Sequence, residues 1–356
     1  MAGAYATMSL NSLYSERNIF MEYITLGSTG ITVNKNGFGA IPIQRLSDSE
    51  AMFILVKAYH GGITFYDTAR GYTDSEKKIG MALSGVRNRI HIATKTHSRD
   101  ANGFWNDLET SLDMLKTDYI DIYQLHNPPF CPKPGDGTGL YDAMAEAKAK
   151  GKIRHIGITN HRLDIAIEAA ESGLYETIQY PVSYLSSPDE LEFVRLCEKN
   201  NIGILAMKAL AGGLITNSAA AYAFLAQYDN VLPIWGIQHE NELDEFLYHQ
   251  EFHPSLSDPA IRQEIEKDVN ELSGDYCRGC GYCLPCPANI EIPTSARISK
   301  LLRRAALSVW LSDDWKSKMN RVNDCLDCGH CKEHCPYSLD VPSLLKENLA
   351  DYNTFC

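Results

Sequence analysis

The sequence predicts an α/β protein, a parallel eight-stranded (β/α)8 or TIM barrel, followed by a small helical domain. Two observations lead to this prediction. Between residues 21 and 249, short β-branched runs alternate with amphipathic segments of helix length. Beyond them, eight of the 11 cysteines fall in two runs. We therefore expect an N-terminal extension (1–20), a barrel (21–273) and a C-terminal domain (274–356).

The barrel prediction rests on the order of its elements. Residues 1–20 show no period and receive no function, while Ile24–Gly39 reads as a hairpin closing the bottom of a barrel. The predicted strands are Asn36–Ile41, Ile63–Ala69, Ile90–Thr96, Ile120–His126, Ile153–Asn160, Thr177–Val182, Gly203–Ala209 and Val231–Gln238. Helices between them include Asp48–His60, Phe104–Lys116, Leu163–Ser172 and Asp189–Asn200. Eight such units favour a barrel over a doubly wound sheet, whose first turn would be Gly-rich.

The remainder of the chain is predicted to be helical. Pro254, Pro259 and the charged helix Ala260–Leu272 lead out of the barrel. Within the C-terminal domain, Ile298–Leu311 and Ser343–Leu349 have helical patterns. The domain is therefore expected to be helical rather than a small β-rich ferredoxin.

The cysteine spacing predicts two 4Fe-4S clusters. The two runs are Cys277, Cys280, Cys283, Cys286 and Cys325, Cys328, Cys331, Cys335, and each is followed by proline. The second run has the bacterial ferredoxin spacing, in which the fourth cysteine ligates the other cluster. That crossing would place Cys335 with the first three cysteines and Cys286 with the later three. Zinc usually takes two separated cysteine pairs, and disulfides need a secretory context. The first run is one residue shorter before Cys286, which leaves the ligand set of its cluster open.

Charge and composition exclude several classes of partner. The formal net charge is −12, and acids and bases balance over residues 275–356, so the barrel carries the excess. This argues against nucleic acid and anionic membranes as partners. No apolar run has the roughly 20 residues of a membrane span, and no secretory signal is visible. A thiol-rich chain without a signal suggests the cytoplasm.

Polar residues follow the predicted strands at the end where barrel enzymes carry their active sites. The runs are Tyr66-Asp67-Thr68-Ala69-Arg70-Gly71-Tyr72, Ala93-Thr94-Lys95-Thr96-His97, Tyr123-Gln124-Leu125-His126 and Gly157-Ile158-Thr159-Asn160. Over about residues 21–249 the chain resembles the aldo/keto reductase family. The resemblance implies that Asp67, Tyr72, Lys95 and His126 are catalytic.

This resemblance implies carbonyl–alcohol chemistry on a small substrate. Tyr72 would supply the proton, although a free tyrosine, with a pKa near about 10, is a reluctant donor. Lys95, held by Asp67, would lower the Tyr72 pKa, since a nearby cation favours the phenolate. His126 would orient the substrate oxygen.

The resemblance also implies nicotinamide contacts. Thr159, Asn160 and Gln179 match positions that hold the carboxamide, with helix capping as an alternative for Asn160. Met207 stands where many members carry a stacking aromatic, and Lys208, Gly212 and Gly213 belong to a pyrophosphate-like loop. NADPH-preferring members carry basic residues after strand eight, whereas no Lys or Arg occurs from 209 to 261 here. NAD(P)H is expected, with NADPH preference doubtful.

Three functions remain open at this point. The first is an NAD(P)H-dependent reductase with attached clusters. The second is a one-electron enzyme in which a ferredoxin or similar partner feeds the clusters and no nicotinamide binds. The third is a redox-sensing protein without activity. Arg45 and Arg70 are candidate anchors for an anionic substrate, because guanidinium groups bind carboxylate and phosphate, or they are surface ion pairs.

Overall fold

A computed structural model describes residues 22–272, 274–304 and 306–356. Within them, eight parallel strands close into a barrel in the order β3 to β10. These strands are β3 (Gly37–Gly39), β4 (Phe65–Asp67), β5 (His91–Thr96), β6 (Ile120–His126), β7 (Ile153–Thr159), β8 (Thr177–Pro181), β9 (Gly203–Met207) and β10 (Val231–Gly236). The predicted barrel is confirmed, and each strand falls inside its predicted range.

The bottom of the barrel is closed by an antiparallel hairpin of β1 (Tyr23–Thr25) and β2 (Thr32–Asn34). Hairpin residues such as Leu26 and Val33 share a buried cluster with Phe65 and Leu232 of the strands. The turn comes very close to β9. At Gly27, where φ is +50°, an added Cβ would lie 2.4 Å from the backbone nitrogen of Gly203. The predicted hairpin and its place are confirmed.

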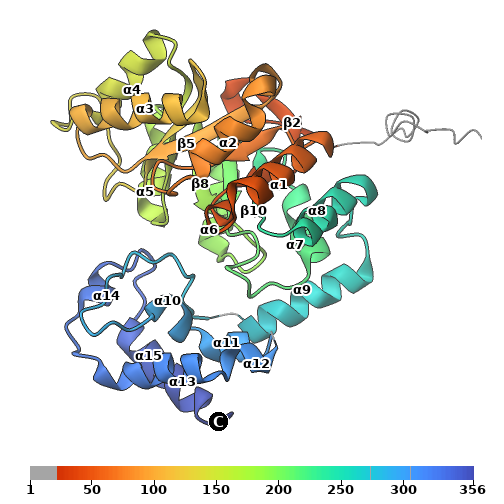
Figure 1. Ribbon diagram of the computed structural model, residues 1–356, viewed down its shortest axis with the longest axis vertical. Coiled ribbons are helices and arrows are strands. Elements are labelled where there is room, and N and C mark those ends of the chain that lie inside the picture. The colour runs from red at the N-terminus through yellow and green to blue at the C-terminus, as the bar shows by residue number, and fades with distance from the viewer. Residues whose placement is uncertain (1–21, 273, 305) are drawn as a thin grey trace, which may run out of the picture.

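Helices surround the strands (Figure 1). They are α1 (Asp48–His60), α2 (Ser75–Leu83), α3 (Ala101–Leu115), α4 (Leu140–Ala149), α5 (Leu163–Ser172), α6 (Pro188–Lys199), α7 (Ser218–Ala226) and α8 (Glu240–Phe252). Short 3-10 turns lie at Gly27–Thr29, Pro42–Arg45 and Ser84–Arg89. Both α1 and α6 begin with a capping box, from Ser47 to Glu50 and from Ser187 to Glu190, which satisfies their first amide groups.

Helix α9 (Pro259–Leu272) runs along the barrel to a helical C-terminal part (Figure 1). Its elements are α10 (Ile292–Ser295), α11 (Ile298–Leu302), α12 (Leu307–Trp310), α13 (Asp313–Asn320), a 3-10 turn (Arg321–Asp324), α14 (His330–Glu333) and α15 (Val341–Tyr352). The helix predicted over Ile298–Leu311 is two short helices, because the chain leaves helical geometry after Arg303.

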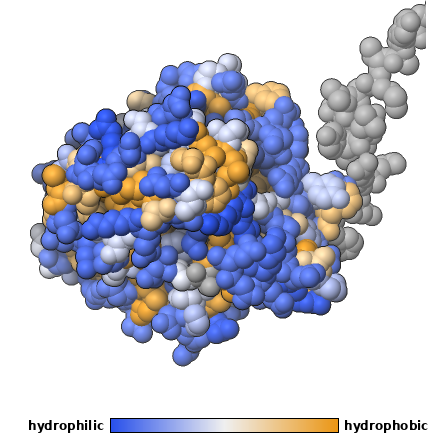
Figure 2. All heavy atoms as spheres, turned by 90° about the horizontal axis from the view of Figure 1, so that it is seen from below, coloured by the Kyte–Doolittle hydropathy of each residue, from blue (hydrophilic) through white to orange (hydrophobic). Residues whose placement is uncertain are grey.

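The C-terminal part packs against the barrel at the carboxyl ends of β7 and β9, through contacts such as His161 with Tyr337 and Lys208 with Arg278. Its outward face is mainly hydrophilic and carries a hydrophobic band (Figure 2). The boundary predicted at residues 273–274 stays a prediction. Arg304, on its C-terminal side, forms ion pairs with Asp268 and Glu271 of α9, on its N-terminal side. The predicted extension 1–20 lies outside the described residues. Among those described, no helix is long and apolar enough to cross a membrane.

Candidate active site and cluster sites

A buried ion pair lies at the carboxyl ends of β4 and β5. The ammonium of Lys95 donates to both carboxylate oxygens of Asp67, each at 2.8 Å, and to the carbonyl of Thr68 at 2.6 Å. Lys95 is 1% exposed and Asp67 3%. Burial raises the pKa of Asp67 and lowers that of Lys95, while the attraction between the two opposes both shifts. The pairing keeps two charges at a site where either alone would be unfavourable.

An amide chain extends this pair across the barrel. Gln124 on β6 donates to Gln179 on β8 at 2.9 Å, and Gln179 donates to Asp67 at 3.4 Å. All three side chains are buried. Gln179, expected to contact a cofactor, is therefore already a hydrogen-bond partner of the Asp67 carboxylate.

Tyr72 lies in the loop after β4, next to the ion pair. The Lys95 ammonium is 5.2 Å from the centre of the Tyr72 ring, and the ring meets His126 edge-on at 5.9 Å. Burial, followed by the Asp67 carboxylate, raises the pKa of Tyr72 well above its usual value. The sequence predicted a lowered pKa. The direction differs because burial of the phenol, together with the Asp67 carboxylate, disfavours the phenolate.

His126 ends β6 and is stacked on His97 with ring centres 3.8 Å apart. Burial, and then the charge of His97, lowers the pKa of His126 well below its usual value. The imidazole is therefore neutral, and its buried Nδ1 has no hydrogen-bond partner among the described residues. The structure thus brings Asp67, Tyr72, Lys95 and His126 together at one mouth of the barrel. Their catalytic roles stay a prediction.

At the strand end expected to hold nicotinamide, some of the polar side chains already have partners within the protein. Thr159 and Asn160 are buried at the end of β7. The Asn160 side chain donates to the carbonyl of Pro128 at 2.9 Å and accepts from the amide of Arg162 at 2.9 Å. Since Arg162 itself is the N-cap residue of α5, Asn160 organises the loop before the helix rather than capping it.

The loop after β9 contacts the C-terminal part. The ammonium of Lys208 donates to the carbonyls of Arg278 at 3.1 Å and Gly279 at 3.3 Å, both within the first cysteine run. Arg297 donates to the carbonyl of Gly212 at 3.0 Å. Met207 packs against the cluster of buried residues inside the barrel, and a Cβ added at Gly213 would meet no atom within 4 Å.

The two candidate anchors are placed differently. Arg70 forms an ion pair with buried Glu76, so its guanidinium has a protein partner. Arg45 is exposed and donates to the side chain of Gln238 at 3.2 Å. Their role in substrate binding stays a prediction.

Two cavities are lined by the cysteines of both runs. The one nearer the barrel is lined by Cys277, Cys280, Cys283, Cys331 and Cys335. The other is lined by Cys283, Cys286, Cys325, Cys328 and Cys331. Each thus holds one predicted crossed set of four ligands, plus a cysteine from the neighbouring set. Every cysteine among the described residues is a free thiol.

These cavities fit four-iron clusters better than single ions. Within the described part of the chain, no three His, Cys, Asp or Glu side chains converge as they would around one metal ion. In a cubane each thiolate binds a different iron, so its four ligand sulfurs line a cavity instead of meeting at a point. We refer to the cavity nearer the barrel as the inner site and to the other as the outer site.

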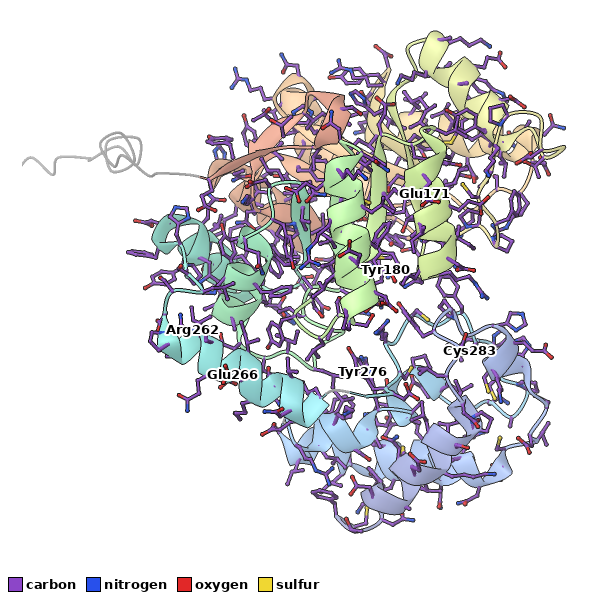
Figure 3. The ribbon with its side chains drawn as sticks, turned by 180° about the vertical axis from the view of Figure 1, so that it is seen from behind. Glu171, Tyr180, Arg262, Glu266, Tyr276 and Cys283 are labelled. Carbon is purple, nitrogen blue, oxygen red and sulfur yellow. The ribbon has the colours of Figure 1, made fainter. Side chains whose placement is uncertain are left out.

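The inner site faces the mouth of the barrel. Figure 3 shows Tyr276 and Cys283 on the side of the C-terminal part that lies against the barrel. The ring of Tyr282, between two cysteines of the inner site, lies 5.3 Å from His161 at the end of β7. Tyr282 is also close enough to contribute to the raised pKa of Tyr72. Tyr282, a residue of the first cysteine run, therefore lies close to the tetrad of Asp67, Tyr72, Lys95 and His126.

Comparison with known proteins assigns the barrel. Residues 35–224, more than half of the chain, match the model of the aldo/keto reductase family. The chain belongs to the aldo/keto reductase family. Residues 276–340 of this oxidoreductase match a 4Fe-4S dicluster domain, which confirms an iron–sulfur region in this reductase.

Curated relatives of this aldo/keto reductase cover the barrel. It is 29% identical over 216 residues to L-galactose dehydrogenase of Arabidopsis thaliana, covering 55% of this chain and 67% of that protein. It is 29% identical over 231 residues to the NADH-specific methylglyoxal reductase of Escherichia coli (strain K12), covering 56% and 70%. The chain thus spans about two thirds of the length of these relatives.

Solved structures share the fold. The holo form of an aldo-keto reductase from Bacillus halodurans aligns with a TM-score of 0.63 at 23% identity, covering 72% of this chain and 99% of that one. An aldo/keto reductase from Klebsiella pneumoniae in complex with NADP and acetate aligns with a TM-score of 0.60 at 21% identity, covering 69% and 95%.

Several site residues of this aldo/keto reductase escaped prediction from sequence. Tyr282 and Arg297 belong to the C-terminal part, and no local pattern shows that they reach the barrel. His97 carried a signal, because it directly follows the strand that ends in Lys95 and Thr96.

Proposed function

We propose that this aldo/keto reductase interconverts a small carbonyl and its alcohol with electrons from two 4Fe-4S clusters, and that no nicotinamide takes part. The observation that carries this proposal is the docking of the first cysteine run on the loop after β9. Lys208 and Gly212, where the resemblance implies a pyrophosphate, are bound by Gly279 and Arg297. A dinucleotide on this loop would have to displace the C-terminal part.

The region after β10 is a second obstacle to a dinucleotide. The carboxylate of Glu242 accepts from the amides of Gln238 at 2.7 Å and His239 at 2.8 Å, so it occupies donors at the start of α8. Glu240 stands beside it in the first turn. A phosphate at this helix start would meet two carboxylates, and the basic side chains there already have partners, since Lys57 pairs with Glu240 at 2.6 Å and Arg45 binds Gln238.

The tetrad supplies the proton chemistry in this proposal. The substrate oxygen lies between Tyr72 and His126, whose neutral ring orients it by a hydrogen bond. Tyr72, protonated at neutral pH, gives its proton to that oxygen, and the Lys95 ammonium lies 5.2 Å from the centre of the ring that becomes a phenolate. Asp67 holds Lys95 in place. Reduction of the carbonyl uses two electrons and two protons, of which the second proton, on carbon, comes from water.

The cysteines would hold the clusters in crossed sets. Cys277, Cys280, Cys283 and Cys335 would bind the inner one, and Cys286, Cys325, Cys328 and Cys331 the outer one. When bound, each cluster supplies one electron at a time. Because the inner site borders Tyr282 next to Tyr72, electrons would leave from it toward the substrate.

Electron entry fits the outer site. Cys328 is exposed, and the neighbouring Leu326 is 67% exposed, an unusual position for a large apolar side chain. A small electron-transfer protein such as a ferredoxin would dock here, with the outer cluster near its own.

The second candidate function is the NAD(P)H-dependent reductase, which was the first expectation from the sequence. Relatives favour it, since one is named an NADH-specific methylglyoxal reductase and another was solved with NADP. In this reading the C-terminal part would move away from the loop after β9, and the clusters would be structural.

Anaerobic calorimetry and turnover separate these functions. We expect neither NADH nor NADPH to bind, and a chemically reduced low-potential dye to support turnover of a carbonyl panel. The control is Tyr72→Phe, which keeps both clusters and retains only background dye oxidation. Binding of either nucleotide together with turnover driven by it, and none by the dye, would overturn the proposal in favour of the nicotinamide enzyme. No turnover with any donor would favour the redox sensor.

A further inference from the structure

Two cations from different parts of the chain contact the loop between Cys277 and Cys280, two cysteines that line the inner site. Lys208, from the barrel, binds the carbonyls of Arg278 and Gly279, which lie between the first two cysteines. Arg297, from the C-terminal part, packs against the same loop. A Cβ added at Gly279 would be 3.1 Å from the Arg297 guanidinium carbon. Both side chains are half-buried, so water screens their charges less than it does at the open surface.

Neither cation is neutralised locally. Within the described residues, neither Lys208 nor Arg297 forms an ion pair with a carboxylate, and Glu291 acts on Arg297 only at longer range. Arg278 differs from these two cations, because its guanidinium forms an ion pair with Glu190 at 2.8 Å. The uncompensated charges are therefore available to the thiolates of Cys277 and Cys280, with which Lys208 interacts electrostatically.

The position of Lys208 and Arg297 matters because a bound cluster is negatively charged. A four-iron cluster with four thiolates is an anion, and reduction adds one negative charge. Nearby uncompensated cations stabilise the more negative state, so they raise the reduction potential. The amide of Gly279 also points at the Cys277 sulfur, at 3.4 Å, which acts in the same direction.

The outer site differs in charge and exposure. Its lining includes the carboxylate of Asp327 and the exposed Cys328, and it contains no Lys or Arg among the described residues. The Asp327 carboxylate repels the added electron there, whereas Lys208 and Arg297 attract it at the inner site; water at the exposed outer site acts in the opposite direction to Asp327.

We propose that Lys208 and Arg297 raise the reduction potential of the inner cluster above that of the outer one. Electrons that enter at the exposed outer site then settle next to the active-site mouth. Lys208 acts here as a positioning residue for charge, a role distinct from the cofactor contact expected from sequence. This inference rests on the proposed function for its direction of electron flow, but the potentials themselves do not depend on turnover.

The test is an anaerobic redox titration of the whole protein without substrate or nucleotide, followed by absorbance and by electron paramagnetic resonance. In Lys208→Met and in Arg297→Gln, we expect one of two reduction steps to move to a more negative potential while the other stays. Lys208→Arg keeps the charge and should leave both steps near those of the wild type.

The matched control is Lys152→Met, which removes a lysine before β7, at the end of the barrel away from the clusters. It should move neither step. Iron content shows whether each variant retains both clusters, and Arg297→Gln keeps the test decisive if Lys208→Met loses one. Unchanged steps in both charge-removing variants, or equal shifts of both steps, would overturn the inference. Turnover with a reduced dye is measured separately, so failure of the proposed function would be seen independently.

Discussion

The Nδ1 atom of His161 lies 2.6 Å from the hydroxyl of Tyr337. This contact joins the end of β7 to the residue that follows Cys335 and Pro336, and the Tyr337 ring also carries the Arg278 guanidinium at 4.3 Å. One hydrogen bond thus links the barrel mouth to the end of the second cysteine run.

The first prediction concerns the pH dependence of this link. Burial, and then the cations Lys208 and Arg278, lowers the pKa of His161 to about 3, while Tyr337 and Tyr282 pack against its ring. An unfolded histidine takes up its proton near about pH 6.5. Between these values the unfolded state binds more protons, so the free energy of unfolding falls as pH falls. The loss attributable to His161 between about pH 7 and 5 is about 2 kcal/mol.

Urea unfolding of wild type and His161→Gln under argon measures this contribution. We expect the variant to lose less free energy of unfolding over that interval. Other buried histidines such as His126 contribute equally to both proteins and cancel in the comparison. Identical pH dependence in the two proteins would contradict the prediction.

The second prediction concerns the proton donor. Tyr72→Phe should lower kcat about 100- to 10,000-fold, the range for loss of a general acid, with unchanged cluster absorbance. Tyr248→Phe on the exposed side of α8 is the control and should retain full activity. Activity near the wild-type value in Tyr72→Phe would remove this tyrosine from the mechanism.

The third prediction separates stability from activity at the ion pair. Lys95→Met should lower the free energy of unfolding by about 3–5 kcal/mol, since it leaves the buried Asp67 carboxylate without its cation. Asp67→Asn combined with Lys95→Met should recover part of that loss, because no unpaired charge remains. Activity should stay lost in both. Denaturant unfolding and steady-state rates test this, and a double variant as unstable as the single one would contradict it.

The fourth prediction concerns the crossed ligands. The anaerobically purified protein should contain about eight irons, and Cys335→Ala about four. Because Cys335 lines the inner site, the reduction step that remains should no longer respond to Lys208→Met. In Cys328→Ala, the remaining step should still respond. Stoichiometric zinc without sulfide in the wild type would contradict the cluster assignment itself.

Sequence periodicity predicted the barrel because strands and helices leave local patterns of two and 3.6 residues. The same pattern placed the strand ends at one edge of the barrel, and the resemblance to the aldo/keto reductase family singled out Asp67, Tyr72, Lys95 and His126 among the residues there. Cysteine spacing likewise predicted the crossed sets that line the two cavities. These features are encoded within short segments.

Docking between the two parts could not be predicted in that way. Lys208 was matched to a cofactor loop by resemblance, while its actual partners lie in the first cysteine run, which follows much later in the chain. Nor could the pKa direction of Tyr72 be foreseen, because it depends on enclosure of the phenol and on the other partners of Lys95. Both outcomes are set by packing between distant segments.

We expect the mixed lining of the inner site to set the order in which its proposed cluster can be assembled. Its cavity is bordered by Cys277, the earliest of the eight cysteines to leave the ribosome, and by Cys335, the latest. A cluster carrier that meets the nascent chain therefore finds an incomplete set until both runs have been translated. Because the barrel is made of earlier residues, we expect it to have folded by then and to present Lys208 to the first cysteine run.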